Sequence, residues 1–251
     1  SLNADAIRTK DFDWNISLNL AHNENEVTRL SNDVFTMDKI LLGDVFIRGG
    51  SSSGTHVLEE GRPIGQFYGL VCNGIDENGR YILVDKDGDG EISDPADYDY
   101  IGSAQPKLTY GITNSFRYKN FDLSFFLRRT IGNDILNATR MAYAQSGFLP
   151  GTNALDDPLT YTLSETPRFS NYYLEKGSFM RLDNLTLGYK IKALNGIRVY
   201  FTAQNLFVIT KYKGLDPEVP MDSGDGLTPG VEPREFYPKA RTFSVGLNLN
   251  F

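Results

Sequence analysis

Hydrophobic and polar residues alternate along this chain in segments of about ten residues. The alternation is strictest at the carboxyl end, where apolar residues fill every second position from Phe243 to Phe251 and small polar residues fill the gaps from Thr242 to Asn250. A strand points successive side chains to opposite faces, so this segment has one apolar and one polar face. The same pattern recurs in residues 11–20, 107–118, 121–130, 179–191 and 197–209. These six segments predict an all-β protein.

The connections between the predicted strands alternate between short and long. Lys119-Asn120 and residues 192–196 fit tight hairpins, whereas residues 21–106, 131–178 and 210–240 form long connections. Outer-membrane barrels alternate short periplasmic turns with long extracellular loops in this way. We therefore expect an antiparallel transmembrane β-barrel segment in which the three long connections are extracellular loops.

Six strands are too few to close a membrane barrel, because small barrels need about eight. Open sheet edges in lipid would leave backbone groups without hydrogen-bond partners. The whole chain, residues 1–251, is therefore expected to be the carboxy-terminal portion of a larger barrel. Its apolar face would contact outer-membrane lipid, and its polar face would line the lumen.

Net charge, apolar runs and the rare residues limit the classes of function that fit this chain. The formal net charge of −7 provides no basic excess for nucleic-acid binding. No apolar run is long enough for a transmembrane helix, and no signal segment follows Ser1, so we expect a removed leader or a start inside a longer protein. Cys72 is the only cysteine and is expected to be a buried structural thiol, and His22 and His56 are expected at the surface.

The acidic segment Asp85–Asp97 carries the one candidate for metal chemistry. Asp85, Asp87 and Asp89 occupy positions one, three and five of a calcium loop, Gly90 supplies the turn at six, and Glu91 offers its carbonyl at seven. Ala96 stands at position twelve, where a closing carboxylate is expected, so Asp97, one residue later, is the candidate closing ligand, and Asp94 is a second. Oxygen ligands at this spacing favour Ca²⁺ over Mg²⁺.

Three classes of protein remain open on these observations. The first is a transport barrel, the second a soluble calcium-binding β-sandwich such as a carbohydrate-binding module, and the third a passive porin. An enzyme is not expected, because the sequence contains no nucleophile elbow, no glycine-rich phosphate loop and no histidine-based triad. No organic cofactor is expected either.

A series of motifs in fixed order resembles one family. The motifs are Glu60–Gly69, Tyr81–Ile92, Ile101–Gly111, Tyr118–Ser124, Tyr173–Tyr189, Val199–Phe207 and Tyr237–Gly246. Together they resemble the carboxy-terminal part of the SusC/RagA-type TonB-linked outer-membrane transporters of Bacteroidetes.

The resemblance implies a plugged barrel of about 22 strands that imports oligosaccharides or peptides. It also implies a SusD-type lipoprotein as the outer partner and the TonB system as the energy source. The family's plug and TonB-contacting segment have no counterpart in this sequence, which again predicts part of a larger protein. The family's acidic motif usually places its last aspartate one residue earlier than Asp97 stands here.

Overall fold

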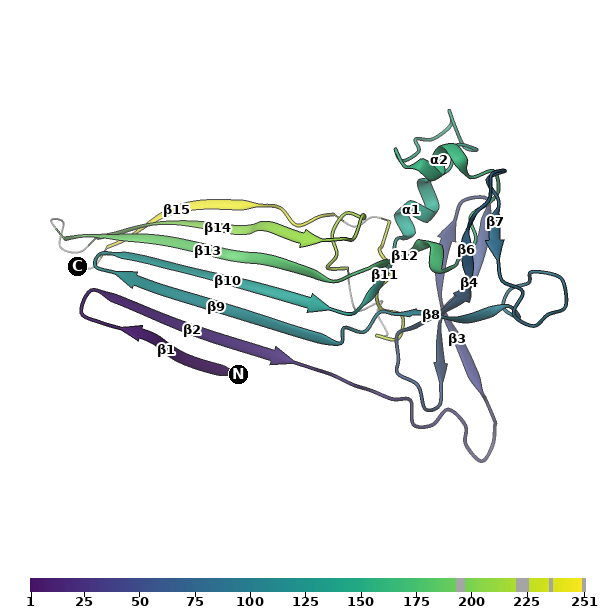
Figure 1. Ribbon diagram of the computed structural model, residues 1–251, viewed down its shortest axis with the longest axis horizontal. Coiled ribbons are helices and arrows are strands. Elements are labelled where there is room, and N and C mark those ends of the chain that lie inside the picture. Colours follow the sequence, from purple (N-terminus) through teal and green to yellow (C-terminus); the bar gives the residue numbers. More distant parts are fainter. Residues whose placement is uncertain (193–196, 220–225, 235–236, 250–251) are drawn as a thin grey trace.

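Seven antiparallel strands form one long sheet in the computed structural model, which describes residues 1–192, 197–219, 226–234 and 237–249 (Figure 1). In spatial order the strands are β1 (Leu2–Arg8), β2 (Phe12–Ala21), β9 (Leu108–Tyr118), β10 (Phe121–Ile131), β13 (Phe179–Ile191), β14 (Ile197–Thr210) and β15 (Thr242–Asn248). Each strand pairs with its neighbours in antiparallel fashion. All six predicted strands are present.

The register of the sheet places like residues side by side. Leu123 of β10 lies opposite Phe116 on one side and Leu187 on the other. The next residue, Ser124, lies between Ser115 and Thr186. Because each strand alternates with period two, one aligned pair fixes the faces for as long as the register is unbroken. The pairing of β13 with both neighbours shifts at Asp183, and beyond the shift Arg181 lies opposite Arg128 and Leu182 lies opposite Leu127. The sheet therefore has one continuous apolar face and one continuous polar face.

Two residues that break the alternation have local explanations. Asn114 is polar on the apolar face, and its side-chain oxygen accepts a hydrogen bond from the indole N–H of Trp14 at 3.1 Å. Phe126 is aromatic on the polar face, and its ring covers Gly111, where an added Cβ would lie 2.6 Å from the ring. The register is unbroken at Asn114, whereas the pairing of β10 with β13 shifts between Phe126 and Leu127.

The tight connections agree with the predicted hairpins. Tyr118 pairs directly with Phe121, and Lys119 adopts a φ of 53°, the left-handed conformation that two-residue hairpin turns require. β13 and β14 pair as far as Ile191 and Ile197, although turn residues 193–196 lie outside the described residues. Residues 250 and 251, the end of the strand predicted at the carboxyl end, also lie outside the described residues. A seventh strand, β1, was not predicted.

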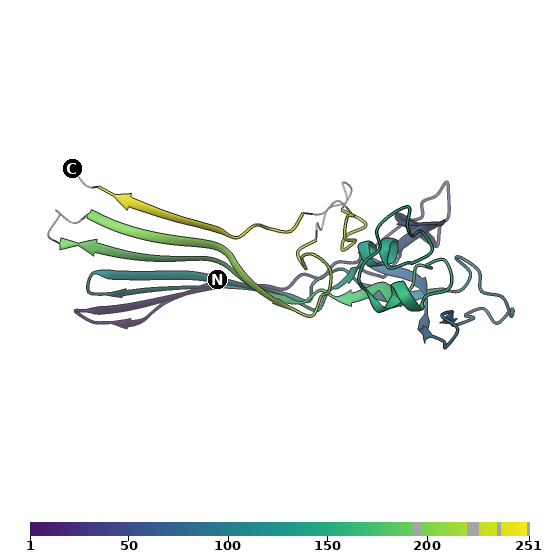
Figure 2. The same ribbon diagram turned by 90° about the horizontal axis from the view of Figure 1, so that it is seen from above.

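The seven-stranded sheet extends away from the rest of the chain as a curved single layer (Figure 2). Its apolar face leaves large side chains exposed, and Val245 retains 76% of its accessible surface. Within the described residues, no second sheet packs on this face. A β-sandwich would cover this face, so the uncovered face favours the barrel over the sandwich alternative.

No helix in the described part of the chain is both long enough and apolar enough to cross a membrane.

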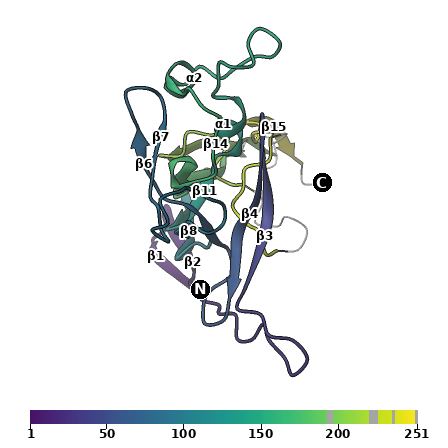
Figure 3. The same ribbon diagram turned by 90° about the vertical axis from the view of Figure 1, so that its right-hand side faces the viewer.

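The three long connections fold together at one end of the sheet, and we call residues 22–107, 132–178, 211–219, 226–234 and 237–241 the loop layer (Figure 3). A four-stranded sheet in the order β3 (Lys39–Ile47), β4 (Gly50–Glu59), β5 (Gln66–Leu70) and β8 (Tyr98–Ser103) is its largest element. The smaller elements are β6 (Cys72–Ile75), β7 (Tyr81–Leu83), β11 (Asp134–Leu136), α1 (Ala138–Tyr143), α2 (Pro158–Thr162), a 3-10 turn (Asn171–Tyr173) and β12 (Leu174–Lys176).

The hydrophobic core lies in this layer rather than in the seven-stranded sheet. Phe67, Leu136, Met141, Phe169 and Tyr173 are among the buried residues that join the four-stranded sheet to the helices. The long connections are therefore a folded layer with its own core, although the sequence pattern suggested only loops.

One histidine prediction was wrong. His22 is exposed as expected, but His56 is completely buried in β4. Its ring nitrogens contact the Thr55 hydroxyl and the Pro229 carbonyl oxygen, each at 2.9 Å, and these polar partners make burial acceptable. Cys72 is buried, as predicted.

Candidate functional site

Charged groups gather at both ends of the polar face. Near the hairpin end, Asp13 forms an ion pair with Arg117 on the adjacent strand, and Asp122 accepts a hydrogen bond from Nε of Arg198 at 2.9 Å. The second pair joins β10 to β14 across β13. It crosses above Gly188, where an added Cβ would lie 2.5 Å from both charged groups. A larger residue at position 188 would fit only if the ends of these two side chains moved.

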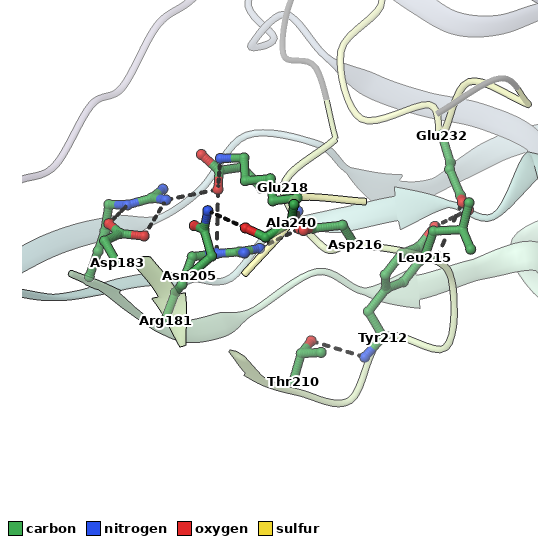
Figure 4. Close-up of polar contacts among 12 residues, drawn as sticks. Arg181, Asp183, Asn205, Thr210, Tyr212, Leu215, Asp216, Glu218, Glu232 and Ala240 are labelled. Atoms are coloured by element: carbon green, nitrogen blue, oxygen red, sulfur yellow. Dashed lines mark hydrogen bonds and ion pairs between the residues drawn. The ribbon is translucent and has the colours of Figure 1, made fainter. Parts of the chain in front are cut away.

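A larger group of charges lies at the opposite end, where the loop layer meets the sheet (Figure 4). We call it the junction cluster, and it consists of Arg128, Arg181, Asp183, Asp216, Glu218 and Lys239. The guanidinium of Arg128 donates to both oxygens of Asp183, at 2.8 and 3.2 Å. Arg181 forms an ion pair with Asp216, and these side chains are only 3% and 5% exposed.

Glu218 is the centre of the junction cluster. Its Oε2 lies 2.8 Å from Arg128, 2.6 Å from Lys239 and 3.6 Å from Nε of Arg181. Burial alone would raise the pKa of Glu218, but the hydrogen bonds from Arg128 and Lys239 outweigh it and lower that pKa below its ordinary value. Glu218 is therefore a carboxylate held in place by three cations from three segments.

Two further contacts position the segments that carry Glu218 and Lys239. The side-chain amide of Asn205 donates to the carbonyl oxygen of Ala240 at 3.1 Å, next to Lys239. On the other side, the Tyr212 hydroxyl donates to the fully buried carboxyl group of Glu232. These contacts, visible in Figure 4, fix both ends of the last long connection.

Glu232 is buried without a cationic partner. Among the described residues, which include every lysine, arginine and histidine of the chain, none forms an ion pair with it. Burial raises the pKa of Glu232, and the hydrogen bond from Tyr212 only partly offsets that rise. Its role is structural, because it joins Tyr212 to the backbone N–H of Leu215.

The structure brings three of the five predicted metal ligands together. Carboxylate oxygens of Asp85, Asp87 and Asp89 lie within 4.8 Å of one another. Gly88 and Gly90 adopt φ values of 78° and 90°, which allow the tight turns between these residues. The backbone N–H of Asp89 favours the ionised form of Asp87, but desolvation and the neighbouring carboxylates outweigh it and raise the pKa of Asp87.

The two candidate closing ligands have other partners, and the backbone carbonyl of Glu91 stays a predicted ligand. Asp97 is buried and accepts hydrogen bonds from the backbone N–H groups of Lys86 at 2.6 Å and Ser93 at 2.7 Å, which lower its pKa. It thus closes the loop through backbone contacts. The side chain of Glu91 is exposed, and Asp94 pairs with Arg168 at 2.7 Å.

The alternation in residues 121–130 places Arg128 on the polar face, but no sequence pattern identified the rest of the junction cluster. Arg181 and Asp216 are 35 positions apart in the sequence, and Arg128 and Glu218 are 90 apart. Strict alternation in β13 would place Arg181 on the apolar face with Leu185, and only the register shift next to Asp183 brings it opposite Arg128 on the polar face. No sequence signal indicates which carboxylates of the last connection reach it.

Comparison with known proteins adds independent information. No protein-family model matches the chain. The TonB-dependent receptor SusC of Bacteroides thetaiotaomicron is 36% identical over 270 residues, covering 100% of this chain and 26% of that receptor. The TonB-dependent receptor P3 of Formosa agariphila is 32% identical, covering 100% of this chain and 28% of the receptor. The chain thus spans about a quarter of the length of these relatives.

Solved structures show the same likeness. The structure of the RagAB peptide transporter superposes with a TM-score of 0.74 at 25% identity, covering 98% of this chain and 28% of that one. The RagAB peptide importer in its closed-closed state superposes with a TM-score of 0.73 at 24% identity, which supports the fold alone. The proteins that this chain resembles are receptors and transporters rather than enzymes.

Proposed function

Because this chain belongs over its whole length to the SusC/RagA-type TonB-dependent receptors, we propose that it forms seven strands of the barrel of an outer-membrane importer. The observation that carries the proposal is the uncovered apolar face, which the register keeps continuous across the sheet. In a barrel this face contacts lipid, and the polar face lines the lumen. The open edges of β1 and β15 pair with strands outside this chain.

The cargo of the importer is an oligosaccharide or a peptide, delivered with a SusD-type lipoprotein on the outside and energised through TonB. The relatives named SusC and RagAB support this assignment. The test is uptake of labelled oligosaccharides and peptides by cells that produce the native-length protein, with and without a proton-motive force. Energy-dependent accumulation of one class is expected. Equal entry without energy would identify a passive porin instead.

The loop layer faces the cell exterior in this proposal, and the Lys119-Asn120 turn faces the periplasm. An epitope tag in the exposed 91–96 stretch is expected to bind antibody on intact cells. The same tag between Lys119 and Asn120 is expected to bind only after the outer membrane is permeabilised. The reverse result would invert the topology.

We also propose that Asp85, Asp87 and Asp89 hold a calcium ion that stiffens the loop layer. Three converging carboxylates supply hard oxygen ligands of the kind Ca²⁺ prefers, and the raised pKa of Asp87 fits a group of like charges that a cation would relieve. Mg²⁺ fits less well because it demands stricter geometry.

The metal proposal is tested by calcium-dependent protection of residues 85–97 from proteolysis in the native-length protein. Asp87→Asn is expected to remove the protection, whereas the exposed control Glu77→Gln keeps it. Lowering the pH is expected to weaken calcium binding at a higher pH than for an ordinary aspartate, because Asp87 retains its proton longer. Protection that is unchanged by Asp87→Asn would refute the site.

A further inference from the structure

We propose that Arg128, Arg181 and Lys239 form an anion-binding site on the lumen wall, and that Glu218 occupies it until an anionic group of the cargo displaces it. The site deepens the proposed importer function by naming a chemical feature of its cargo, and it rests on that function. The ligand class is an oxyanion, either a carboxylate or a sulfate. Both present several acceptor oxygens to guanidinium and ammonium donors.

The unused hydrogen-bonding capacity of Arg181 is the first observation. Arg181 is 3% exposed, yet its buried Nε–H has no hydrogen-bond partner. This Nε lies 3.6 Å from Oε2 of Glu218, which is too far for a hydrogen bond. A buried donor without a partner is costly, so a ligand oxygen placed closer to Nε would be favoured over Glu218.

The charge balance of the junction cluster is the second observation. Asp183 forms an ion pair with Arg128, and Asp216 forms one with Arg181. Neither pair involves Glu218. If Glu218 leaves, three cations remain beside two carboxylates, and the cluster carries one net positive charge. An arriving group with one negative charge, a carboxylate or a sulfate ester, restores neutrality, so the exchange exposes no lasting uncompensated charge.

The third observation is that the site is accessible. The side chains of Arg128 and Glu218 are each 29% exposed, and that of Lys239 is 40% exposed. Arg128 also lines a hollow of about 240 Å³ on the polar face, together with Asn19 and Thr109. A ligand on the lumen side can therefore reach the cations without unfolding the sheet.

Displacement of Glu218 loosens one short segment. Asp216 remains bound to Arg181, and Tyr212 remains bound to Glu232, so residues 212–216 keep both anchors. Residues 217–219 lose the ion pairs of Glu218, which are the charged contacts that the described residues show between this segment and the wall. Anion binding at the wall thus frees the adjoining part of the last connection, which couples cargo binding to loop movement.

The test uses the native-length protein purified in detergent, with sodium sulfate and sodium acetate as probes and sodium chloride at equal ionic strength as control. Hydrogen exchange is measured in a peptide covering residues 211–219, and anion binding is measured by equilibrium dialysis. Both probes are expected to raise exchange in that peptide saturably above the chloride control, and the better probe shows whether sulfate or carboxylate is preferred. Exchange in β10 and β13 is expected to stay constant.

Variants sharpen the test. Glu218→Gln removes the internal competitor and is expected to tighten probe binding by about tenfold, the effect of one charge-assisted hydrogen bond. Adding Lys239→Met to this variant is expected to reverse the gain, and the exposed control Glu77→Gln changes nothing. Equal effects of probes and chloride, or no gain in Glu218→Gln, would overturn the site. Energy-dependent uptake that persists in that case would leave the importer function standing.

Discussion

Adjacent positions on one strand should respond in opposite ways to the same charge. Phe125 lies near the middle of β10 on the apolar face, where its ring stacks with Phe116 at 6.1 Å between centroids. Ser124 lies one residue earlier on the polar face, between Ser115 and Thr186. We predict that Phe125→Arg prevents stable assembly, whereas Ser124→Arg is tolerated.

The magnitude follows from the position of the charge. An arginine facing lipid at the bilayer midplane costs about 2–4 kcal/mol. At about 1.4 kcal/mol per tenfold change, this lowers the folding equilibrium constant by roughly 30- to 700-fold. Ser124→Arg places the same charge on a wet face among small polar side chains and beside Asp122, and is expected to cost less than about 1 kcal/mol.

The assay is a urea titration of the native-length protein in lipid vesicles, with the folded fraction read from gel mobility without heating. Phe125→Leu controls for loss of the ring, because it keeps the position apolar and is expected to cost far less than the arginine. Equal destabilisation by the arginine at positions 124 and 125 would refute the assignment of the two faces.

Three further predictions concern the polar face and the loop layer. Gly188→Ala is expected to lower the thermal midpoint, because its Cβ would lie 2.5 Å from the Asp122–Arg198 ion pair, and a melting curve checks this. Arg181→Met leaves Asp216 buried without a cation, so we expect a loss of about 3–5 kcal/mol and faster proteolytic cleavage within residues 211–219. The pKa of Glu232 is raised in the folded state, so its neutral carboxyl group stabilises the fold, and this stability is lost as the pH rises through the folded-state pKa. Glu232→Gln is expected to abolish this pH dependence of the free energy of unfolding. Urea midpoints at several pH values would show a native decline that the glutamine variant lacks.

The faces of the main sheet could be predicted from the sequence because period two leaves little freedom. A shift of one residue would turn every apolar side chain of a strand to the wrong face, so the alternation nearly fixes the register. β1 was not predicted because it has only seven residues and its alternation is interrupted. The interruption lies where its pairing with β2 shifts, between Asp5 and Ile7.

The loop layer could not be predicted in the same way. Its strands are as short as three residues, too few for a periodic signal, and β5 pairs with β8 across a gap that holds β6, β7 and the acidic loop. The burial of His56 depends on Phe67 and Pro229, which lie far apart in the sequence. Such residues meet only through tertiary packing.

Of the two candidate sites, the acidic group could be predicted from the sequence and the junction cluster could not. Asp85, Asp87 and Asp89 are close in the sequence, and the glycines between them bring their carboxylates together, so spacing alone predicted the group. The junction cluster joins β10, β13 and two parts of the last connection, and its charges meet only when the sheet and the loop layer are both folded.

The central claim, that the sheet separates lipid from lumen, is tested most directly by scanning β10 with spin labels. Single cysteines at residues 121–128 would be introduced into native-length protein that carries Cys72→Ser, then labelled in lipid vesicles. Contact with dissolved oxygen and with a water-soluble nickel complex would be measured at each position. We predict alternation with period two and opposite phase, with oxygen contact highest at Leu123 and Phe125. Nickel contact at those two positions equal to that at Ser124 would contradict the barrel account.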